Sequence, residues 1–404
     1  MQIIYDLYKD YGYAITERSN PGPDGLFPVE RRILMGTYLI AKDKFVKCAK
    51  IVGEVFGRFH PHSPESIYGT LAKLVRRGLL KGQGNFGKIA LQDAPPAAMR
   101  YTEAMLEPKI RRIVFELIDF VPFKEIEGTE PEPTYLPSPV PLLVGEGLAE
   151  GISYWRFVSF LFPLEELFKA LEGILDGKEY IPKPAFKGCT ITSGDLKEFW
   201  TKGQGSYIIE PMVNETSKYI DVLGKLQNIN VGKFDKEGIE YSDLSSKGQF
   251  RLRIYKKRGK NISKFVPKWN VKTSLLMFYD GKVYIDIGLK DMMMQQYSLF
   301  MQAYRNKLEY DKAKLEDKIE DMRIIEQIQK LIRQGKTTEN QILSSFKNPV
   351  ERERCERVIK SYPIRTLLRI KTDVQELKSK LSDLNKKLKD FDKSCRDFAF
   401  SLLS

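Results

Sequence analysis

Apolar side chains near the start of the chain recur at helical spacing and predict three short helices. Two of them lie within residues 29–59, where every third or fourth position is apolar. After a break at residues 60–62, Ser63 or Ser66 can cap a third helix that runs to about Arg77. The apolar stripe of this third helix consists of Ile67, Leu71, Leu74 and Val75.

The third helix also has a polar face, and a glycine-rich segment follows it. The polar side chains, spaced by four, three and four residues, are Ser66, Thr70, Lys73 and Arg77. The glycine-rich segment, Gly82–Gly87, predicts a hairpin. Three helices and a hairpin are typical of a winged helix-turn-helix, whose third helix enters the major groove of DNA.

A mixed region follows. Residues 128–141 are dense in proline and glutamate, which indicates a linker or a domain boundary. Strand-like runs then continue to about residue 290, and an Asp280-Gly281 turn joins the last two of them. The runs are 205–210, 250–255, 275–279 and 282–287.

The last region is charged and has heptad spacing. Leu308, Leu315 and Met322 repeat at seven residues, and six apolar positions from Val374 to Phe391 alternate spacings of three and four. These two arms flank residues 333–370. The pattern predicts an antiparallel helical pair that holds a small globular tip roughly 40 Å from the body. A plain coiled-coil spacer fits the same pattern.

Composition favours a folded protein with a polyanionic partner. The chain has 404 residues, 42% of them hydrophobic, and 66 Lys and Arg against 53 Asp and Glu give a net charge of +13. Nucleic acid is the first expectation, ahead of an anionic membrane. The four cysteines are scattered, and the chain shows neither a signal peptide nor an apolar run able to span a membrane. We therefore expect a soluble cytoplasmic protein.

Tyr101 stands out among the 20 tyrosines through its neighbours. Arg100 precedes it, and both histidines of the chain lie in His60-Pro61-His62. A phenol with an ordinary pKa near 10 needs a base or a cationic field to act as a nucleophile. Histidine can accept the proton, and arginine matches phosphate oxygens. A packed tyrosine and structural histidines are the alternative interpretation.

Two further patterns are set aside. Gly82 to Lys88 is close to a phosphate-binding Walker loop, but Ile89 stands where Ser or Thr would be needed. Asp390-Phe391-Asp392 lies within a predicted coiled-coil arm, where charged flanks are ordinary. We therefore predict no metal site in this chain.

Five motifs between Asp24 and Glu103 resemble the A subunits of bacterial gyrase and topoisomerase IV, which are type IIA topoisomerases. In order, they are residues 24–32 (DGLFPVERR), 47–55 (KCAKIVGEV), 60–62 (HPH), 82–87 (GQGNFG) and 97–103 (AAMRYTE). Weaker similarity continues through residues 119–122, 128–130 and 141–144 into the arms. The resemblance therefore covers nearly the whole chain.

The resemblance implies a role for each matching residue. Tyr101 is the nucleophile that forms a 5′-phosphotyrosyl bond, Arg100 stabilises the transition state, and His62 assists proton transfer with support from His60. Arg18 aligns, one residue out of register, with a further catalytic arginine. Arg31, Arg32 and Lys47 fall where the family grips the DNA backbone. Leu148 corresponds to an isoleucine that wedges between base pairs.

The resemblance also implies an architecture: an α+β multidomain chain with a winged-helix DNA gate (1–127), an α/β tower (128–290) and a coiled-coil arm (291–404). The arm carries a helical dimerisation tip at about residues 333–370. Two copies are expected to cut both strands of double-stranded DNA. A separate B-type chain is expected to supply Mg²⁺ through a Toprim domain, and ATP hydrolysis, in an A₂B₂ complex.

Several residues depart from the family pattern and change what we expect of drug sensitivity and of the topological reaction. Phe27 and Glu30 replace basic residues, and Glu65 and Gly69 stand where quinolone drugs are usually bound, which predicts weak quinolone sensitivity. Because the sequence ends soon after the second arm, we expect no DNA-wrapping β-pinwheel, as in split phage topoisomerases. Relaxation or decatenation is then favoured over negative supercoiling. The competing hypotheses are a non-catalytic winged-helix and coiled-coil architectural protein, and a tyrosine nickase or recombinase.

Overall fold

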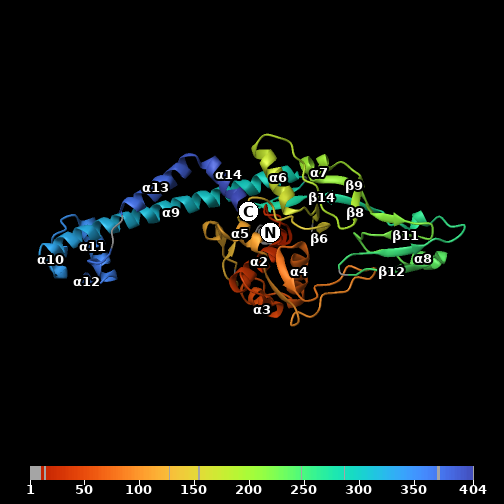
Figure 1. Cartoon of the computed structure of the whole chain (residues 1–404), viewed down its shortest axis with the longest axis horizontal. Coiled ribbons are helices and arrows are strands. Elements are labelled where there is room, and N and C mark those ends of the chain that lie inside the picture. Colours follow the sequence, from red (N-terminus) through yellow and green to blue (C-terminus); the bar gives the residue numbers. More distant parts are fainter. Residues whose placement is uncertain are drawn as a thin grey trace, which may run out of the picture. The chain divides into compact units, whose positions relative to one another are not determined.

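The computed structural model describes residues 11–12, 15–126, 128–152, 155–246, 248–285, 287–370 and 374–403. The chain is a mixed α/β protein that divides into two compact units (Figure 1). Unit 1 comprises Met1–Phe300 and Ala399–Ser404, and unit 2 comprises Met301–Phe398.

Three helices lie near the start of the described part of unit 1, as the apolar spacing predicts. They are α2 (Pro28–Ala41), α3 (Cys48–Arg58) and α4 (Pro64–Arg77). The Ser63 side chain caps α4 by accepting a hydrogen bond from the Ser66 amide. The helix ends at Gly78, whose φ of 79° lies in the left-handed region that glycine tolerates. Ile67, Leu71 and Leu74 of the predicted stripe are buried.

A three-stranded antiparallel sheet of order β1-β3-β2 packs with these helices. Its strands are β1 (Val46–Lys47), β2 (Leu80–Gln83) and β3 (Glu103–Leu106). The hairpin predicted at Gly82–Gly87 is longer than the sequence indicates, because β2 pairs with β3 and its last residue, Gln83, lies opposite Glu103. The glycines instead begin a long connection, residues 84–102, which carries Tyr101 to the edge of β3.

A five-stranded sheet of order β6-β7-β14-β9-β8 forms the second part of unit 1. Residues Leu164–Leu175 (α6) and Leu196–Lys202 (α7) are helical. Phe160 of β7 contacts Phe199 and Tyr207 in the core of this part. The strands are β6 (Leu148–Ile152), β7 (Arg156–Phe160), β8 (Cys189–Ser193), β9 (Gln204–Pro211) and β14 (Trp269–Ser274).

A four-stranded sheet of order β10-β11-β13-β12 has its own apolar core, which includes Ile220, Phe234 and Leu252. Its elements are β10 (Val213–Glu215), β11 (Tyr219–Val222), α8 (Gly232–Glu237), β12 (Tyr241–Asp243) and β13 (Leu252–Tyr255). The strands β15 (Leu276–Tyr279) and β16 (Lys282–Ile285) form the predicted hairpin. Both turn residues, Asp280 and Gly281, have positive φ, as a two-residue hairpin turn requires.

The proline- and glutamate-rich segment 128–141 belongs to the interior of unit 1. Most of its residues from Glu132 onward are buried, and the Leu136 amide donates to the Asp24 carboxylate. Gln296 donates to the carbonyls of Leu136 and Ser138. The segment includes β5 (Glu132–Pro133), which pairs with β4 (Phe123–Lys124), and α5 (Pro108–Phe115) precedes them in the chain. The segment is therefore part of the core rather than an exposed connection.

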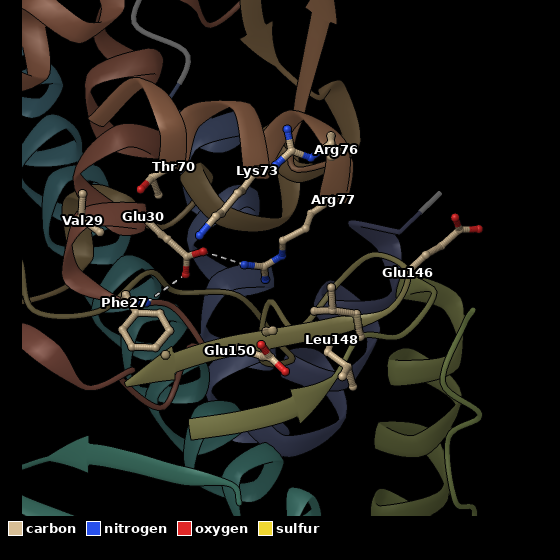
Figure 2. Close-up of a pocket in the computed structure, with 13 residues that line it drawn as sticks. Phe27, Val29, Glu30, Thr70, Lys73, Arg76, Arg77, Glu146, Leu148 and Glu150 are labelled. Atoms are coloured by element: carbon tan, nitrogen blue, oxygen red, sulfur yellow. Dashed lines mark hydrogen bonds and ion pairs between the residues drawn. The ribbon is translucent and has the colours of Figure 1, made fainter. Parts of the chain in front are cut away.

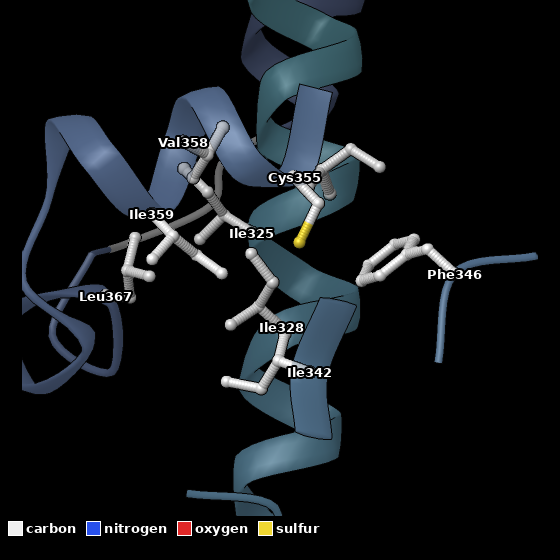
Figure 3. Packing of buried hydrophobic residues seen from close by; sticks show 9 residues of the cluster. Ile325, Ile328, Ile342, Phe346, Cys355, Val358, Ile359 and Leu367 are labelled. Carbon is white, nitrogen blue, oxygen red and sulfur yellow. The ribbon is translucent and has the colours of Figure 1, made fainter. Parts of the chain in front are cut away.

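Unit 2 contains most of the long helix α9 (Leu289–Arg333) and a small helical cluster. Ile325 and Ile328 of α9 pack against Ile342, Cys355 and other apolar residues of the cluster (Figure 3). The remaining helices are α10 (Glu339–Leu343), α11 (Pro349–Ser361), α12 (Ile364–Leu367), α13 (Val374–Lys389) and α14 (Phe391–Ser401). Within α13, which is described throughout, no side chain is buried, and the predicted heptad positions are its less exposed residues.

Candidate functional site

Tyr101 lies on an exposed turn immediately before β3. Its side chain is 64% exposed, although tyrosine is a large and partly apolar residue. The Arg100 guanidinium carbon lies 4.5 Å from the centre of the Tyr101 ring. Among the described residues, the Tyr101 hydroxyl has no hydrogen-bond partner. The structure therefore presents a phenol to solvent with a permanent positive charge against its ring.

The backbone of this turn is fixed from several sides while the Tyr101 side chain projects outward. The Tyr101 amide donates to the Ala98 carbonyl at 2.9 Å, which closes the turn. The first residues of α3 hold its flanks: the Cys48 amide donates to Thr102, and the Ala49 amide donates to Met99. Gly84 lies behind the turn with a φ of +105°, where a side chain would be strained.

The two histidines and Arg32 form a second group. The rings of His60 and His62 meet edge to face, with centres 4.5 Å apart. Arg32 donates to Nδ1 of His60 at 2.8 Å and forms an ion pair with Glu132. Burial, and then the charges of Arg32 and His62, lower the pKa of His60 to about 4. The exposed Arg18 is close enough to lower this pKa further.

Within a single chain, the Tyr101–Arg100 pair and the histidine group are separate. No hydrogen bond, ion pair or ring contact among the described residues joins Tyr101 or Arg100 to either histidine. The structure thus places Arg100 against Tyr101, and Arg18 near the histidines. A single chain does not bring the two sets into contact.

Several predicted DNA-binding residues line one pocket of about 480 Å³ (Figure 2). Thr70 and Lys73 of α4 lie on one side, and Leu148 of β6 lies on the other. Lys73 extends toward Glu30, yet it has no hydrogen-bond or ion-pair partner in the part of the chain that the structure describes. The pocket therefore combines an available ammonium group with an apolar side chain that begins a strand.

Three arginines predicted to bind DNA have internal partners instead. Arg31 is buried against Asp24, with Nε 2.8 Å from the carboxylate. Arg77 donates to Glu30 and to the carbonyls of Leu142 and Val144. The exposed fraction of the side chain is only 6% for Arg31, 11% for Arg32 and 10% for Arg77. Their guanidinium groups therefore have partners inside the fold, and their contact with phosphate stays a prediction.

Lys47 and Ser66 remain accessible. Lys47 forms an ion pair with Glu103 across the β1–β3 pair, but half of its side chain is exposed. Such a pair is weak and can exchange for a phosphate. Ser66 is exposed on the first turn of α4, on the same helix as Thr70 and Lys73.

The sequence prediction missed Tyr68 and Arg76. Arg76 lines the pocket and donates to the Phe86 carbonyl, and Tyr68 contacts both ends of the Tyr101 turn. The helical spacing of Tyr68 is that of an ordinary partly buried aromatic residue. Thr102, 34 residues further along the chain, is brought beside it by the pairing of β3 with both β1 and β2.

In the part of the chain that the structure describes, acidic side chains do not gather into a metal site. Among the described residues, no group of three or more His, Cys, Asp or Glu side chains could hold a metal ion. The described residues therefore do not fit a resident Mg²⁺, and we derive no catalytic step through a metal. The same residues contain no helix long and apolar enough to cross a membrane.

Comparison with known proteins identifies the family. The model of the DNA gyrase/topoisomerase IV A-subunit family matches residues 18–400. The chain is 40% identical to a DNA gyrase A subunit from Synechocystis over 227 residues, which are 49% of this chain and 26% of that protein. It is 35% identical to a topoisomerase 4 A subunit from Staphylococcus epidermidis over 240 residues, 53% of this chain and 29% of that protein.

A DNA gyrase A subunit from Thermotoga maritima is 33% identical over 237 residues, which are 52% of this chain and 28% of that protein. Each of these alignments spans less than a third of the relative's length. The family match, in contrast, runs through both units of the structure. The chain with the exposed Arg100–Tyr101 pair belongs to the family of DNA gyrase and topoisomerase IV A subunits.

Proposed function

We propose that this chain is the DNA breakage-and-rejoining subunit of an ATP-dependent type IIA topoisomerase. The observation that carries the proposal is Tyr101, a tyrosine with an unpartnered, exposed hydroxyl and an arginine against its ring, among the residues that the structure describes. Membership of the A-subunit family supports the same interpretation. In this function Tyr101 attacks a phosphodiester of double-stranded DNA.

The reaction is a transesterification in both directions. The phenolic oxygen of Tyr101 forms a bond to phosphorus, the bond to the 3′ oxygen breaks, and the phenolic proton passes to a base. The 3′ oxygen takes up a proton as it leaves. Arg100 stabilises the negative charge that builds on the phenolic and phosphoryl oxygens. Resealing reverses these steps, because one ester has replaced another without loss of bond energy.

We infer that the base comes from the histidine group of a second copy. His62 is exposed, while His60 is turned toward Arg32, so His62 is the residue of the pair that can reach a substrate. Because the described residues of one chain do not join Tyr101 to His62, a homodimer is the arrangement that unites them. Arg18, exposed beside the histidines, would then face the same phosphate.

The DNA grip is proposed to lie along α4 and at the start of β6. Ser66, Thr70 and Lys73 offer hydroxyl and ammonium groups to phosphates, and Lys47 adds a further charge. Leu148 supplies an apolar side chain that can enter a base step and bend the duplex. The internally paired arginines Arg31, Arg32 and Arg77 support these residues from within the fold.

The finer architecture is part of the same proposal. The three helices with the β1-β3-β2 sheet suit a winged-helix DNA gate, the larger sheets suit a tower, and α9 with α13 suits an arm with a dimerisation tip. Mg²⁺ and ATP are proposed to be bound by a B-type Toprim and ATPase chain in an A₂B₂ complex. Relaxation or decatenation, in the cytoplasm, is the proposed activity.

Trapping a covalent complex tests this function. The chain is mixed with supercoiled plasmid, Mg²⁺ and its B-type partner, and denatured with detergent. We expect DNA joined to Tyr101 at staggered double-strand breaks. Tyr101→Phe should abolish the adduct and leave DNA affinity nearly unchanged, because one hydroxyl contributes little to a grip based on cations.

Tyr38→Phe is the matched control, since it removes a phenolic oxygen from α2 of the same unit, where Tyr38 stacks on Phe115. It should form adducts like the wild type. Failure of the wild type to form any adduct with its partner would favour a non-catalytic architectural protein. A single-strand nick that needs no partner would favour a nickase or recombinase.

A further inference from the structure

The Tyr68 hydroxyl touches both ends of the turn that carries Tyr101. Tyr68 lies on α4, and its oxygen is 2.5 Å from the Ala97 carbonyl oxygen and 2.9 Å from Oγ1 of Thr102. Residues 97 and 102 are the first and last of a six-residue segment that includes Tyr101. One side-chain atom of the helix therefore closes the base of this segment.

The direction of both hydrogen bonds is fixed by chemistry. A carbonyl oxygen can only accept, so the single proton of the Tyr68 hydroxyl must go to Ala97. The Thr102 hydroxyl must then donate to the Tyr68 oxygen. Burial raises the pKa of Tyr68 above its ordinary value of 10.0, so the phenol keeps the proton that it donates. The result is a relay of two hydrogen bonds from Thr102 through Tyr68 to Ala97.

Both ends of this relay are held by the backbone. Thr102 is 0% exposed, and its carbonyl accepts from the Cys48 amide at 2.9 Å. The Ala97 amide donates to the Asn85 carbonyl at 2.9 Å, so residue 97 is also held on its other side. Between these fixed points, the Tyr101 hydroxyl extends into solvent with no hydrogen-bond partner among the described residues.

We propose that Tyr68 is a positioning residue for the Tyr101 nucleophile, tying the turn that carries it to the DNA-facing helix α4. This inference rests on the proposed function. The same helix carries Ser66, Thr70 and Lys73. When these residues contact phosphates of the DNA, the connection through Tyr68 sets the position of the Tyr101 side chain relative to the DNA backbone. The Tyr68 oxygen is directed at the turn and is engaged by Ala97 and Thr102, so Tyr68 is proposed to act through Tyr101 rather than on the phosphate.

The expected consequence is a loss of rate without a loss of affinity. Displacement of a reacting group by about 1 Å can slow a reaction by about 100-fold. Tyr68→Phe removes only the oxygen that joins Ala97 to Thr102. We therefore expect adduct formation about 10- to 100-fold slower than wild type, with the DNA dissociation constant changed by less than about twofold.

The experiment measures single-turnover adduct formation on a short DNA duplex, with Mg²⁺ and the B-type partner present. DNA affinity is measured on the same preparations. Thr102→Val should give a loss similar to that of Tyr68→Phe, and the double variant should be no slower than either, because both hydroxyls serve one connection. Thr102→Ser, which keeps the hydroxyl, should restore the wild-type rate.

A duplex with sulfur in place of the 3′ oxygen separates positioning from proton donation. Sulfur leaves without a proton, so the defect of Tyr68→Phe should persist on this duplex if Tyr68 positions Tyr101. Loss of the defect on the sulfur duplex would overturn the proposal in favour of an acid role. Wild-type rates for Tyr68→Phe on ordinary DNA would overturn it as well.

Tyr38→Phe controls for the loss of a tyrosine oxygen in unit 1, and thermal unfolding of all variants checks that they fold. Should Tyr68→Phe weaken DNA binding as much as it slows cleavage, the positioning role is wrong. Should the wild type form no adduct at all, the proposed function fails and this inference fails with it. If the wild type forms adducts normally and Tyr68→Phe is fully active, the inference about Tyr68 is overturned while the proposed function stands.

Discussion

His60 is kept neutral by its surroundings. It is half-buried, and Arg32 donates to its Nδ1 atom, so the ring proton resides on Nε2. A proton added to Nδ1 would meet the Arg32 guanidinium directly. At neutral pH, His60 therefore serves as an uncharged acceptor that orients Arg32 against Glu132. His62, two residues further on, is exposed and is therefore available for the proposed proton transfer.

Acid should destabilise the protein partly through His60. Its folded-state pKa is about 4, below the ordinary 6.5, so the unfolded chain takes up the proton first as the pH falls. The contribution of His60 to stability is complete above pH 6.5 and is lost as the pH falls toward 4. We expect His60→Gln to lose less stability between about pH 7 and about pH 4.5 than wild type, as measured by the urea midpoint.

His62→Gln is the control for this titration, because it makes the same chemical change two residues away on an exposed side chain. It should retain the larger part of the acid sensitivity contributed by His60, because burial and Arg32 still lower the pKa of His60 when the smaller effect of His62 is removed. Parallel pH profiles for wild type and His60→Gln would contradict the interpretation.

Close packing of α2 against α3 depends on one glycine. A Cβ atom at Gly36 would lie 2.5 Å from Cγ2 of Val55, closer than real carbon atoms approach. Gly36 is buried in the middle of α2, where glycine costs helix stability, so the close approach is the physical reason for it. The two helices frame the start of β1 and the Cys48 amide that holds Thr102.

Gly36→Ala should lower the free energy of unfolding by about 1–3 kcal/mol, the usual cost of overpacking a core. Gly53→Ala on α3 is the matched control, since nothing lies within 4 Å of its added methyl group. There the gain in helix propensity should stabilise the protein by about 0.5–1 kcal/mol. Urea unfolding of both variants measures the contrast, and equal effects would show that the helices can move apart.

The basic charge of the molecule is unevenly distributed. Residues 212–268, which contain the four-stranded sheet, have 13 Lys and Arg against 6 Asp and Glu, within a chain whose net charge is +13. Many cations of the protein are also paired, as Arg31, Arg77 and Arg253 show. The net charge therefore predicts attraction to a polyanion. Cations that are already paired within the protein are less available to contact phosphates, so the unpaired ones should release most of the counterions from DNA.

DNA binding should weaken steeply as the salt concentration rises. Lys73 should contribute to this dependence as one phosphate contact. Lys73→Met should reduce the slope of log affinity against log salt by about 0.9, the value for one phosphate contact. Lys380→Met removes the same charge from α13, where Lys380 pairs with Glu376, and should leave the slope unchanged. An unchanged slope for Lys73→Met would remove Lys73 from the interface.

Local patterns predict much of this protein because they depend on nearby residues only. Helical spacing and the Ser63 cap locate α2, α3 and α4, and the Asp280-Gly281 turn locates the last hairpin. The adjacency of Arg100 and Tyr101 follows directly from the covalent chain. The motifs between residues 24 and 103 are sufficient to predict the family.

Tertiary structure decides which of these residues are available. The sequence predicts Arg31 and Arg77 as DNA contacts, yet acidic and carbonyl groups elsewhere in the sequence satisfy them inside the fold. The hairpin that begins at Gly82 is longer than predicted, because β2 pairs with a strand that starts twenty residues after Gln83. Tyr68 gains its importance through the same pairing. The burial of a residue and its hydrogen-bond partners depend on contacts between segments that are distant in the sequence. Local spacing of residue types therefore cannot predict them.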